Sequence, residues 1–344
     1  MPAVGLDISD DALRFMELVP DGKGLRPLNY ATHNYATAGG ERDRKKLKEA
    51  IATFAAEHKL SFANVSLPEA QAYLANIQIP HVAPQDVRGA IELRLEEHVP
   101  ISGPDAIFDY VEVPGEGVSH KEHINVVVSV LPRTVVDDYL SLFDGTGIVP
   151  RSFEFESHAT ARAVVPHGDS GTFLVVDIGK MQTDVFVVAH NVVEFSASLD
   201  IGGHYFTQAL VKALGVEYTE AEKIKTEKGL IGDHDDKVVT AMTPLLADFN
   251  MRLLRHYAYW QSHHNEKFGG NIETVLLSGG GANLRGLPEF LATGLDVRVS
   301  VGNPWVNVMT FDKNVPSLPQ RQALSYATAI GLALRTAAPQ GTHI

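Results

Sequence analysis

Three turns follow apolar runs at widely separated points of the sequence, and their residue types suit a phosphate ligand. Asp7 and Asp177 each end an apolar run, and each is followed by an isoleucine and a small residue. The third turn is Ser278–Gly281, directly after the apolar run Thr274–Leu277. A carboxylate can hold Mg²⁺, and glycine lets an anion approach backbone amides closely. These residue types therefore favour a metal-bound phosphate as the ligand.

Several other site motifs are absent from the sequence. It contains no G-x-x-x-x-G-K-[ST] phosphate loop, no G-x-G-x-x-G after an apolar run, and no glycine ahead of Ser278 that would complete a G-x-S-x-G elbow. Zero cysteines exclude disulfides, zinc-thiolate sites and thiol catalysis. The chain has 15 histidines, and two groups of them stand close in sequence: His120 with His123, and His256 with His263 and His264. No carboxylate stands at a recognised ligand spacing from either group. We therefore expect no metal site other than one for Mg²⁺.

The two aspartates are positioned by the same strand-turn-strand pattern. In Thr172–Ala189 two β-branched runs flank a short polar turn, which predicts a hairpin. Val4–Leu18 repeats this pattern about half a chain earlier. The repeat predicts a duplicated α/β fold, with two similar halves around a cleft.

The composition changes at Pro80 and Pro84, which indicates an insert in the first half at about residues 80–150. It is long enough for a β/α subdomain. A helical connector is expected at Phe153–Val165, ahead of the second hairpin, and a long amphipathic helix is expected at Pro244–His264. The helices expected inside the insert are Gln85–His98 and Pro132–Phe143, and the strands are Phe108–Val113 and Ile124–Leu131.

Composition limits the classes of function. The chain has 344 residues, 44% of them hydrophobic, and a formal net charge of −13, so it lacks the basic footprint of a nucleic-acid-binding protein. No apolar run approaches the length of a membrane span, and the N-terminus lacks a signal-peptide pattern. The sequence therefore predicts a cytoplasmic protein that neither inserts into a membrane nor binds nucleic acid.

In order and spacing, the three turns resemble the two phosphate loops and the adenosine loop of the actin-like ATPase superfamily. Within it, the chain is similar to the type IV pilus assembly protein PilM family, a relative of FtsA, over most of residues 4–335. The stretches that carry the resemblance are IELRLEEHVPI, IGGHYFTQALVKALGV, AEKIK, and LLSGGGANLRGLPEFLA followed by Asn303-Pro304.

The resemblance implies an actin-like fold of four parts. Residues 1–165 would form the first half, including the insert at about 80–150, and residues 166–322 the second half. A C-terminal helix at 323–335 would return to the first half, and residues 336–344 would be a disordered tail.

The resemblance also implies a role for each site residue, with ATP or ADP and Mg²⁺ as the cofactors. Asp7 and Asp177 would hold Mg²⁺ through water molecules. Glu156 would orient a water if hydrolysis occurs. The nucleotide-binding residues would be Ser9, Asp10, Gly179, Lys180, Gln182, Thr183, Glu222, Lys225, Gly279, Gly280, Gly281 and Asn283.

The phosphate turns depart from the family pattern. The first has Ser9, Asp10 and Asp11 where the family has a glycine and a hydroxyl residue, and each carboxylate beside a triphosphate costs about 1 kcal/mol or more unless screened. In the second, Lys180 could neutralise phosphate, pair with Asp10 or Asp11, or fill the pocket. We therefore expect weak or absent ATP hydrolysis.

The implied function is a nucleotide-gated scaffold of the type IV pilus machine. The implied partners are other components of that machine and a PilN-like inner-membrane protein, whose short cytoplasmic tail would dock between the first-half core and the insert. This would place the chain in the cytoplasm, peripheral to the inner membrane. The alternatives are a genuine ATPase or small-molecule kinase of the same superfamily, or an FtsA-like division or filament protein. The oligomeric state stays open.

Overall fold

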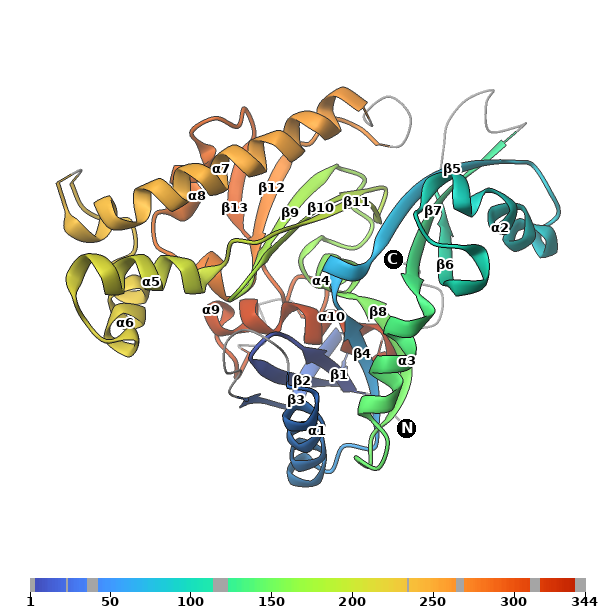
Figure 1. The fold of residues 1–344 in the computed structure, drawn as a ribbon, viewed down its shortest axis with the longest axis horizontal. Helices are drawn as coiled ribbons and strands as arrows, with labels where there is room; N and C mark the ends of the chain where they lie inside the picture. Colours follow the sequence, from blue (N-terminus) through green and yellow to red (C-terminus); the bar gives the residue numbers. More distant parts are fainter. Residues whose placement is uncertain are drawn as a thin grey trace.

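Two five-stranded sheets of the same strand order form the body of the protein, and a three-stranded sheet lies beside them (Figure 1). Long helices cover the outer faces of the sheets, and two further helices lie between them in the centre of the view. The structure is a computed structural model, and it describes residues 4–22, 24–35, 43–113, 123–233, 235–263, 269–309 and 316–337.

The first sheet places Asp7 near the end of its central strand. Its strands are β1 (Val4–Ile8), β2 (Ala12–Asp21), β3 (Gly24–Asn34), β4 (Phe62–Leu67) and β8 (Val149–Phe155). The order is β3-β2-β1-β4-β8, with β1 to β3 antiparallel and β4 and β8 running parallel to β1. Phe15 and Leu6 pack on one face against α1 (Arg44–His58) and α3 (Arg133–Leu142). Every residue of β1 is buried, which fits a strand covered on both faces.

The second sheet repeats this arrangement around Asp177. Its strands are β9 (Phe173–Ile178), β10 (Thr183–Ala189), β11 (Val192–Leu199), β12 (Thr274–Ser278) and β13 (Arg298–Val301). The order β11-β10-β9-β12-β13 matches that of the first sheet, again with an antiparallel hairpin pair followed by two parallel strands. The outer face is covered by α5 (Gly203–Leu214), α6 (Tyr218–Lys228), α7 (Lys237–His263) and α8 (Leu287–Ala292). The predicted duplication into two similar halves is confirmed at the level of strand order.

Two helices, α4 (Glu156–Val164) and α10 (Ala327–Ala337), cross in the centre of the molecule and pack against both sheets (Figure 1). A Cβ atom on Gly331 of α10 would lie 1.7 Å from the carbonyl oxygen of Ala159 in α4, and one on Gly5 of β1 would lie 2.0 Å from the carbonyl oxygen of Ala329. Both contacts require glycine, because no other residue lets the backbones approach so closely. The two halves are therefore joined through backbone-to-backbone packing at α10.

The third sheet, ordered β5-β7-β6, lies outside the two large ones and carries helix α2 (Val87–His98). Its strands are β5 (Tyr73–Pro80), β6 (Ala106–Glu112) and β7 (His123–Pro132). It touches the second sheet where Val127 packs on Val192 of β11, and where Asn76 Nδ2 donates to the Glu194 carbonyl oxygen at 3.0 Å. This sheet begins before Pro80, at Tyr73, and the predicted domain boundaries stay a prediction.

Some predicted helix boundaries are wrong. Residues 153–155 are not helical; they end β8, because parallel pairing with β4 supplies their backbone partners, and α4 begins only at Glu156. Helix α7 begins at Lys237, and Pro244 lies inside it rather than at its start. Proline favours the first helical turn, but surrounding packing can hold it in the interior.

The C-terminal helix is also divided differently from the prediction. It consists of α9 (Gln320–Ala323), a 3-10 turn at Leu324–Tyr326, and α10, which continues to Ala337. The remainder of the predicted disordered tail, residues 338–344, lies outside the described residues.

Candidate functional site

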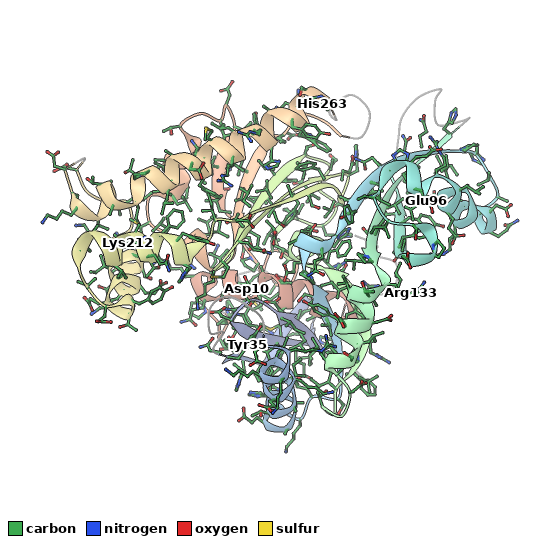
Figure 2. All side chains as sticks on the ribbon, viewed as in Figure 1. Asp10, Tyr35, Glu96, Arg133, Lys212 and His263 are labelled. Atoms are coloured by element: carbon green, nitrogen blue, oxygen red, sulfur yellow. The ribbon has the colours of Figure 1, made fainter. Side chains whose placement is uncertain are left out.

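A cavity of about 610 Å³ lies between the two large sheets, where three turns converge. Figure 2 places Asp10 near the centre of the molecule, between α5, which carries Lys212, and the part of the first sheet next to Tyr35. All but one of the sequence-predicted site residues line this cavity: Asp7, Ser9, Asp10, Glu156, Asp177, Gly179, Lys180, Gln182, Glu222, Lys225, Gly279, Gly280, Gly281 and Asn283.

The exception is Thr183, which does not line the cavity. Its side chain is fully buried, and its Oγ1 donates to the carbonyl oxygen of Ile201 at 2.6 Å. Thr183 therefore anchors the start of β10 to the segment ahead of α5, and its predicted contact with phosphate stays untested.

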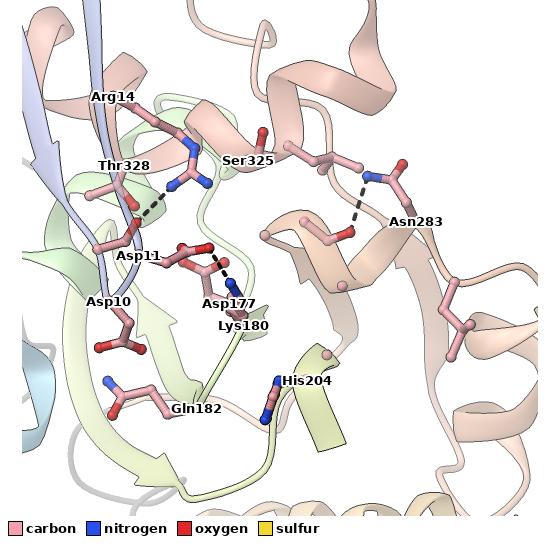
Figure 3. A pocket seen from close by; sticks show the side chains of 18 of the residues that line it. Asp10, Asp11, Arg14, Asp177, Lys180, Gln182, His204, Asn283, Ser325 and Thr328 are labelled. Carbon is pink, nitrogen blue, oxygen red and sulfur yellow. Dashed lines mark hydrogen bonds and ion pairs between the residues drawn. The ribbon is translucent and has the colours of Figure 1, made fainter. Parts of the chain in front are cut away.

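The first turn, Ser9–Asp11, connects β1 to β2 and is fixed from several sides. The Ser9 amide and hydroxyl both donate to the Ala12 carbonyl oxygen, at 3.1 and 3.0 Å. Arg14 Nη1 donates to Ser9 Oγ at 2.7 Å, and the Tyr35 amide donates to the Asp11 carbonyl oxygen at 2.8 Å. The backbone of this turn is therefore held in place while the Asp10 and Asp11 side chains project into the cavity region (Figure 3).

The second turn, Gly179–Gln182, connects β9 to β10, and backbone hydrogen bonds fix its main chain. The Gly179 amide donates to the Gln182 carbonyl oxygen at 2.9 Å, and the His204 amide at the start of α5 donates to the Lys180 carbonyl oxygen at 2.9 Å. A Cβ atom on Gly202 would lie 2.5 Å from that same carbonyl oxygen. The glycine pair ahead of α5 thus lets the turn lie directly on the helix N-terminus.

Asp7 and Asp177 face one another from the ends of the two central strands. Ser66 Oγ donates to Asp7 Oδ1 at 3.1 Å, Arg14 Nη1 lies 3.8 Å from Asp7 Oδ2, and Thr160 Oγ1 donates to Asp177 Oδ2 at 3.2 Å. Burial, and then the negative charge of Asp7, raise the pKa of Asp177 to about 7. A cation placed between these carboxylates would relieve that repulsion.

The oxygen donors of this pair fit a magnesium ion that is completed by other ligands. Mg²⁺ in proteins is often bound through one or two carboxylates together with substrate phosphates and water. Among the described residues, no group of three or more histidine, aspartate or glutamate side chains is arranged to hold a metal by itself. Asp7 and Asp177 are therefore suited to a metal that arrives with a phosphate ligand.

An ion pair joins the first and second turns across the cavity. Lys180 Nζ lies 2.7 Å from Asp11 Oδ2, and Figure 3 draws the two side chains meeting beside Asp177. Burial lowers the pKa of Lys180, but the hydrogen bond to Asp11 and its negative charge outweigh this and raise the pKa overall. Lys180 therefore pairs with Asp11 in this structure, which is one of the possibilities that the sequence left open.

The wall opposite the first sheet is made by α5 and α6. Lys225 Nζ donates to Glu222 Oε2 at 2.8 Å, to Thr207 Oγ1 at 2.8 Å and to the Gly203 carbonyl oxygen at 3.0 Å. The Glu222 and Lys225 pair predicted from the AEKIK segment is thus a linked unit on one helix face. Polar groups of this kind can fix a ribose or base by hydrogen bonding.

The glycine turn Gly279–Asn283 closes the end of the cavity next to Asp177. Gly279 has φ of +77°, and a Cβ atom on it would lie 2.4 Å from Asp177 Oδ1. A Cβ atom on Gly281 would lie 2.2 Å from Ile178 Cγ2. Glycine is therefore required at both positions for this turn to pack on the end of β9.

Sequence reasoning missed a number of residues that line or support the cavity, and six of them show why. Arg14 could have been found, because a tight hairpin places it directly opposite Asp7. Asp184 is buried near the start of β10, and burial followed by the charge of Glu69 raises its pKa well above the usual range. The others come from helices and gave no local signal; they are Thr160, His204, Tyr218 and Thr328.

The family model described as Type IV pilus assembly protein PilM matches residues 5–337 of the chain. A solved structure described as a PilM-PilN type IV pilus biogenesis complex has a TM-score of 0.79 and 23% identity, covering 98% of this chain and 99% of that one. The ethanolamine utilization protein EutJ from Carboxydothermus hydrogenoformans has a TM-score of 0.56 and 16% identity, with 97% and 90% coverage.

A third similar structure is MreB5 of Spiroplasma citri bound to ADP. Its TM-score is 0.50 and its identity 12%, covering 89% of this chain and 93% of that one. Together these similarities confirm the expected actin-like ATPase fold. Among the described helices, none is both long enough and apolar enough to cross a lipid bilayer.

Proposed function

This chain belongs to the type IV pilus assembly protein PilM family, and we propose that it is a scaffold of the type IV pilus assembly machine. The observation that carries the proposal is the match of the family model over residues 5–337. In this role the chain is cytoplasmic and is held at the inner membrane through protein partners.

The proposed partner is a PilN-like inner-membrane protein that contributes a short cytoplasmic tail. Support comes from the similar structure described as a PilM-PilN complex, which covers nearly all of this chain. The tail docks between the first sheet and the insert, with α2 and β6 as the borders of its site. Leu93 on α2 is 87% exposed, and an apolar tail residue could cover it.

The proposed ligand of the central cavity is ATP or ADP with Mg²⁺. Asp7 and Asp177 hold the metal, and amides of the first and second turns bind phosphate oxygens. Glu222 and Lys225 bind the ribose or base, and the glycine turn packs along the adenine. The metal supplies positive charge between two carboxylates that otherwise repel each other. Because Asp10 and Asp11 also face the phosphates, we expect weak binding and slow hydrolysis.

Calorimetry with synthetic amino-terminal tails of PilN-like proteins tests the scaffold proposal. We expect saturable binding of at least one tail, and binding at least about five-fold weaker for Leu93→Glu, because a buried charge without a partner is costly. The matched control is Met251→Glu, since Met251 is 55% exposed on α7, which covers the second sheet and lies outside the insert. No heat change across several tails, or equal losses in the two variants, would contradict the proposed docking.

A genuine ATPase is the alternative, and the position of Glu156 in the cavity wall favours it. Glu156 is the first residue of α4 and directly follows β8 of the first sheet. Phosphate release above background that is lost in Asp177→Ala and in Glu156→Gln would establish hydrolysis. Release that survives both substitutions would trace to a contaminant.

A further inference from the structure

The Lys180–Asp11 ion pair lies where the proposed function needs phosphate. Both residues belong to the turns that face each other across the cavity, and their charged atoms are 2.7 Å apart. The side chains keep 44% and 23% of their surface exposed. An ion pair that is this exposed is weak, so a ligand with several negative charges can compete with Asp11 for Lys180.

The Lys180 and Asp11 side chains can change partners, whereas the backbones of both turns are fixed by hydrogen bonds. Ser9, Ala12 and Tyr35 fix the backbone of the first turn, and the start of α5 fixes that of the second. Lys225, another cation of the cavity wall, makes three hydrogen bonds within its own wall. Lys180 instead reaches across from the second sheet to the first.

We propose that Lys180 is a phosphate-binding side chain that Asp11 holds in the nucleotide-free protein, and that a nucleoside polyphosphate displaces Asp11 when it binds. The ion pair then acts as a clasp that keeps the first and second turns together until the ligand replaces it. This inference rests on the proposed nucleotide-binding function and adds to it the residue pair that controls entry.

Titration with a fluorescent ATP analogue and Mg²⁺ tests the exchange. We expect Asp11→Asn to bind about ten-fold more tightly than the unmodified chain, because it removes both a competitor and a repulsive charge. Asp10→Asn is the matched control, since it removes a neighbouring charge without releasing Lys180, and we expect a gain of about three-fold. In a Lys180→Met background, the Asp11→Asn gain should fall to that of Asp10→Asn.

A distance measurement tests the clasp without any nucleotide. The chain has no cysteine, so cysteines introduced at Lys45 on α1 and Lys212 on α5 can carry spin labels at only those two sites. Both positions are exposed; α1 packs on the first sheet and α5 on the second, and the cavity lies between these sheets. We expect the distance distribution to lengthen or broaden in Asp11→Asn, to stay unchanged in Asp10→Asn, and to contract when nucleotide is added to Asp11→Asn.

The two readouts separate the possible failures. Ordinary nucleotide binding with equal gains in Asp10→Asn and Asp11→Asn, and an unchanged distance, would overturn the clasp and leave the proposed function standing. Absence of binding in every variant would overturn the exchange together with the nucleotide-binding part of the proposed function. A widened distance in Asp11→Asn with the ten-fold gain in affinity supports the proposal.

Discussion

The first and second turns occupy equivalent places in two sheets of identical strand order, yet different contacts hold them. Side chains help to fix the first, since Arg14 donates to Ser9 Oγ and the Tyr35 hydroxyl donates to the Ser9 carbonyl oxygen. The second is fixed by backbone amides at the start of α5. They also carry opposite charges, Asp10 and Asp11 against Lys180. The strand pattern thus sets the duplicated fold, while the turn residues give each half its own chemistry.

The central strands of the two sheets also differ, and substitutions there should have the largest effect on stability. β1 has Gly5 where α10 packs against it, whereas β9 has the buried residue Val175 at the middle of the strand. We expect Gly5→Val to destabilise the protein by more than about 4 kcal/mol, because its side chain would meet the backbone of Ala329. Urea denaturation followed by circular dichroism measures this loss.

Val175→Ala is the control for Gly5→Val, since it removes volume from the equivalent region of the second half. We expect a smaller loss of about 1 to 3 kcal/mol from lost burial and a partly filled cavity. Equal losses for the two substitutions would show that α10 does not pack more tightly on β1 than the surrounding helices do on β9.

Substitution of Asp177 and of Asp7 by asparagine should change the free energy of unfolding in opposite directions at pH 8. Folding raises the pKa of Asp177 from its ordinary value of 3.8 to about 7, so folding favours its protonated form. Its contribution to stability is complete below about pH 4 and is lost as the pH rises through 7. Asp177→Asn should therefore stabilise the nucleotide-free protein at pH 8 by about 2 kcal/mol, with little effect at pH 4.

Asp7→Asn should instead destabilise the protein at pH 8, because Asp7 lies near Arg14 and accepts a hydrogen bond from Ser66. Paired urea titrations at pH 4 and pH 8 measure both variants. If both substitutions stabilise the protein, the ionised form is destabilised at both aspartates. The assignment of this destabilisation to Asp177 alone would then be wrong.

The two large sheets have antiparallel edge strands, β3 and β11, and β11 carries a buried carboxylate, Glu194. β3 is largely exposed, whereas the third sheet covers β11, where burial raises the pKa of Glu194 to about 9. Neither carboxylate oxygen of Glu194 has a hydrogen-bond partner among the described residues, although His190 Nδ1 lies 3.5 Å from Oε1. The geometry and the pKa agree that this group is strained when ionised.

Glu194→Gln should stabilise the protein by about 1 kcal/mol at pH 8, since the neutral amide is still a buried polar group. The sign follows from the raised pKa: stability is complete below the unfolded value of about 4.5 and falls as the pH rises through 9. The gain should shrink toward pH 5. A gain that is independent of pH would mean that shape, and not ionisation, limits the packing of the third sheet.

The smallest expected effect is that of the Lys180–Asp11 pair on stability. Because both side chains are partly exposed, Asp11→Asn should change the free energy of unfolding by less than about 1 kcal/mol, and less still in 1 M salt. Thermal unfolding at two salt concentrations measures it. A larger loss would make Asp11 a structural residue of the first turn and would weaken the comparison with Asp10.

The polar and glycine turns at the strand ends could be predicted from the sequence, but contacts between residues far apart in the chain could not. Asp7, Asp177 and Gly279 could be found because β-branched runs followed by polar or glycine turns are local signals. Thr160 and Thr328, which bond each other at 3.0 Å, lie on helices far apart in the chain, and no local pattern connects them. The choice of Asp11 rather than Asp10 as the partner of Lys180 depended on side-chain directions across the cavity.

The boundary errors have a similar origin. Residues 153–155 were predicted as helix because an alanine-rich helical stretch follows them, but the edge of the first sheet offered parallel pairing with β4. At Pro244 a local rule about helix starts was overridden by the apolar stripe of α7, which buries Leu246, Phe249 and Leu253. In both places tertiary packing decided against local propensity.

The contact between Gly5 and Ala329 has a consequence for how the chain reaches its fold. β1 is translated before the second half of the fold, but α10, the helix that covers it, is translated after that half. The first sheet must therefore wait, with one apolar face uncovered, while the whole second half is translated. Such long-range closure slows folding and exposes the intermediate to aggregation. A ribosome-bound chain that lacks α10 should accordingly be a preferred substrate for chaperones.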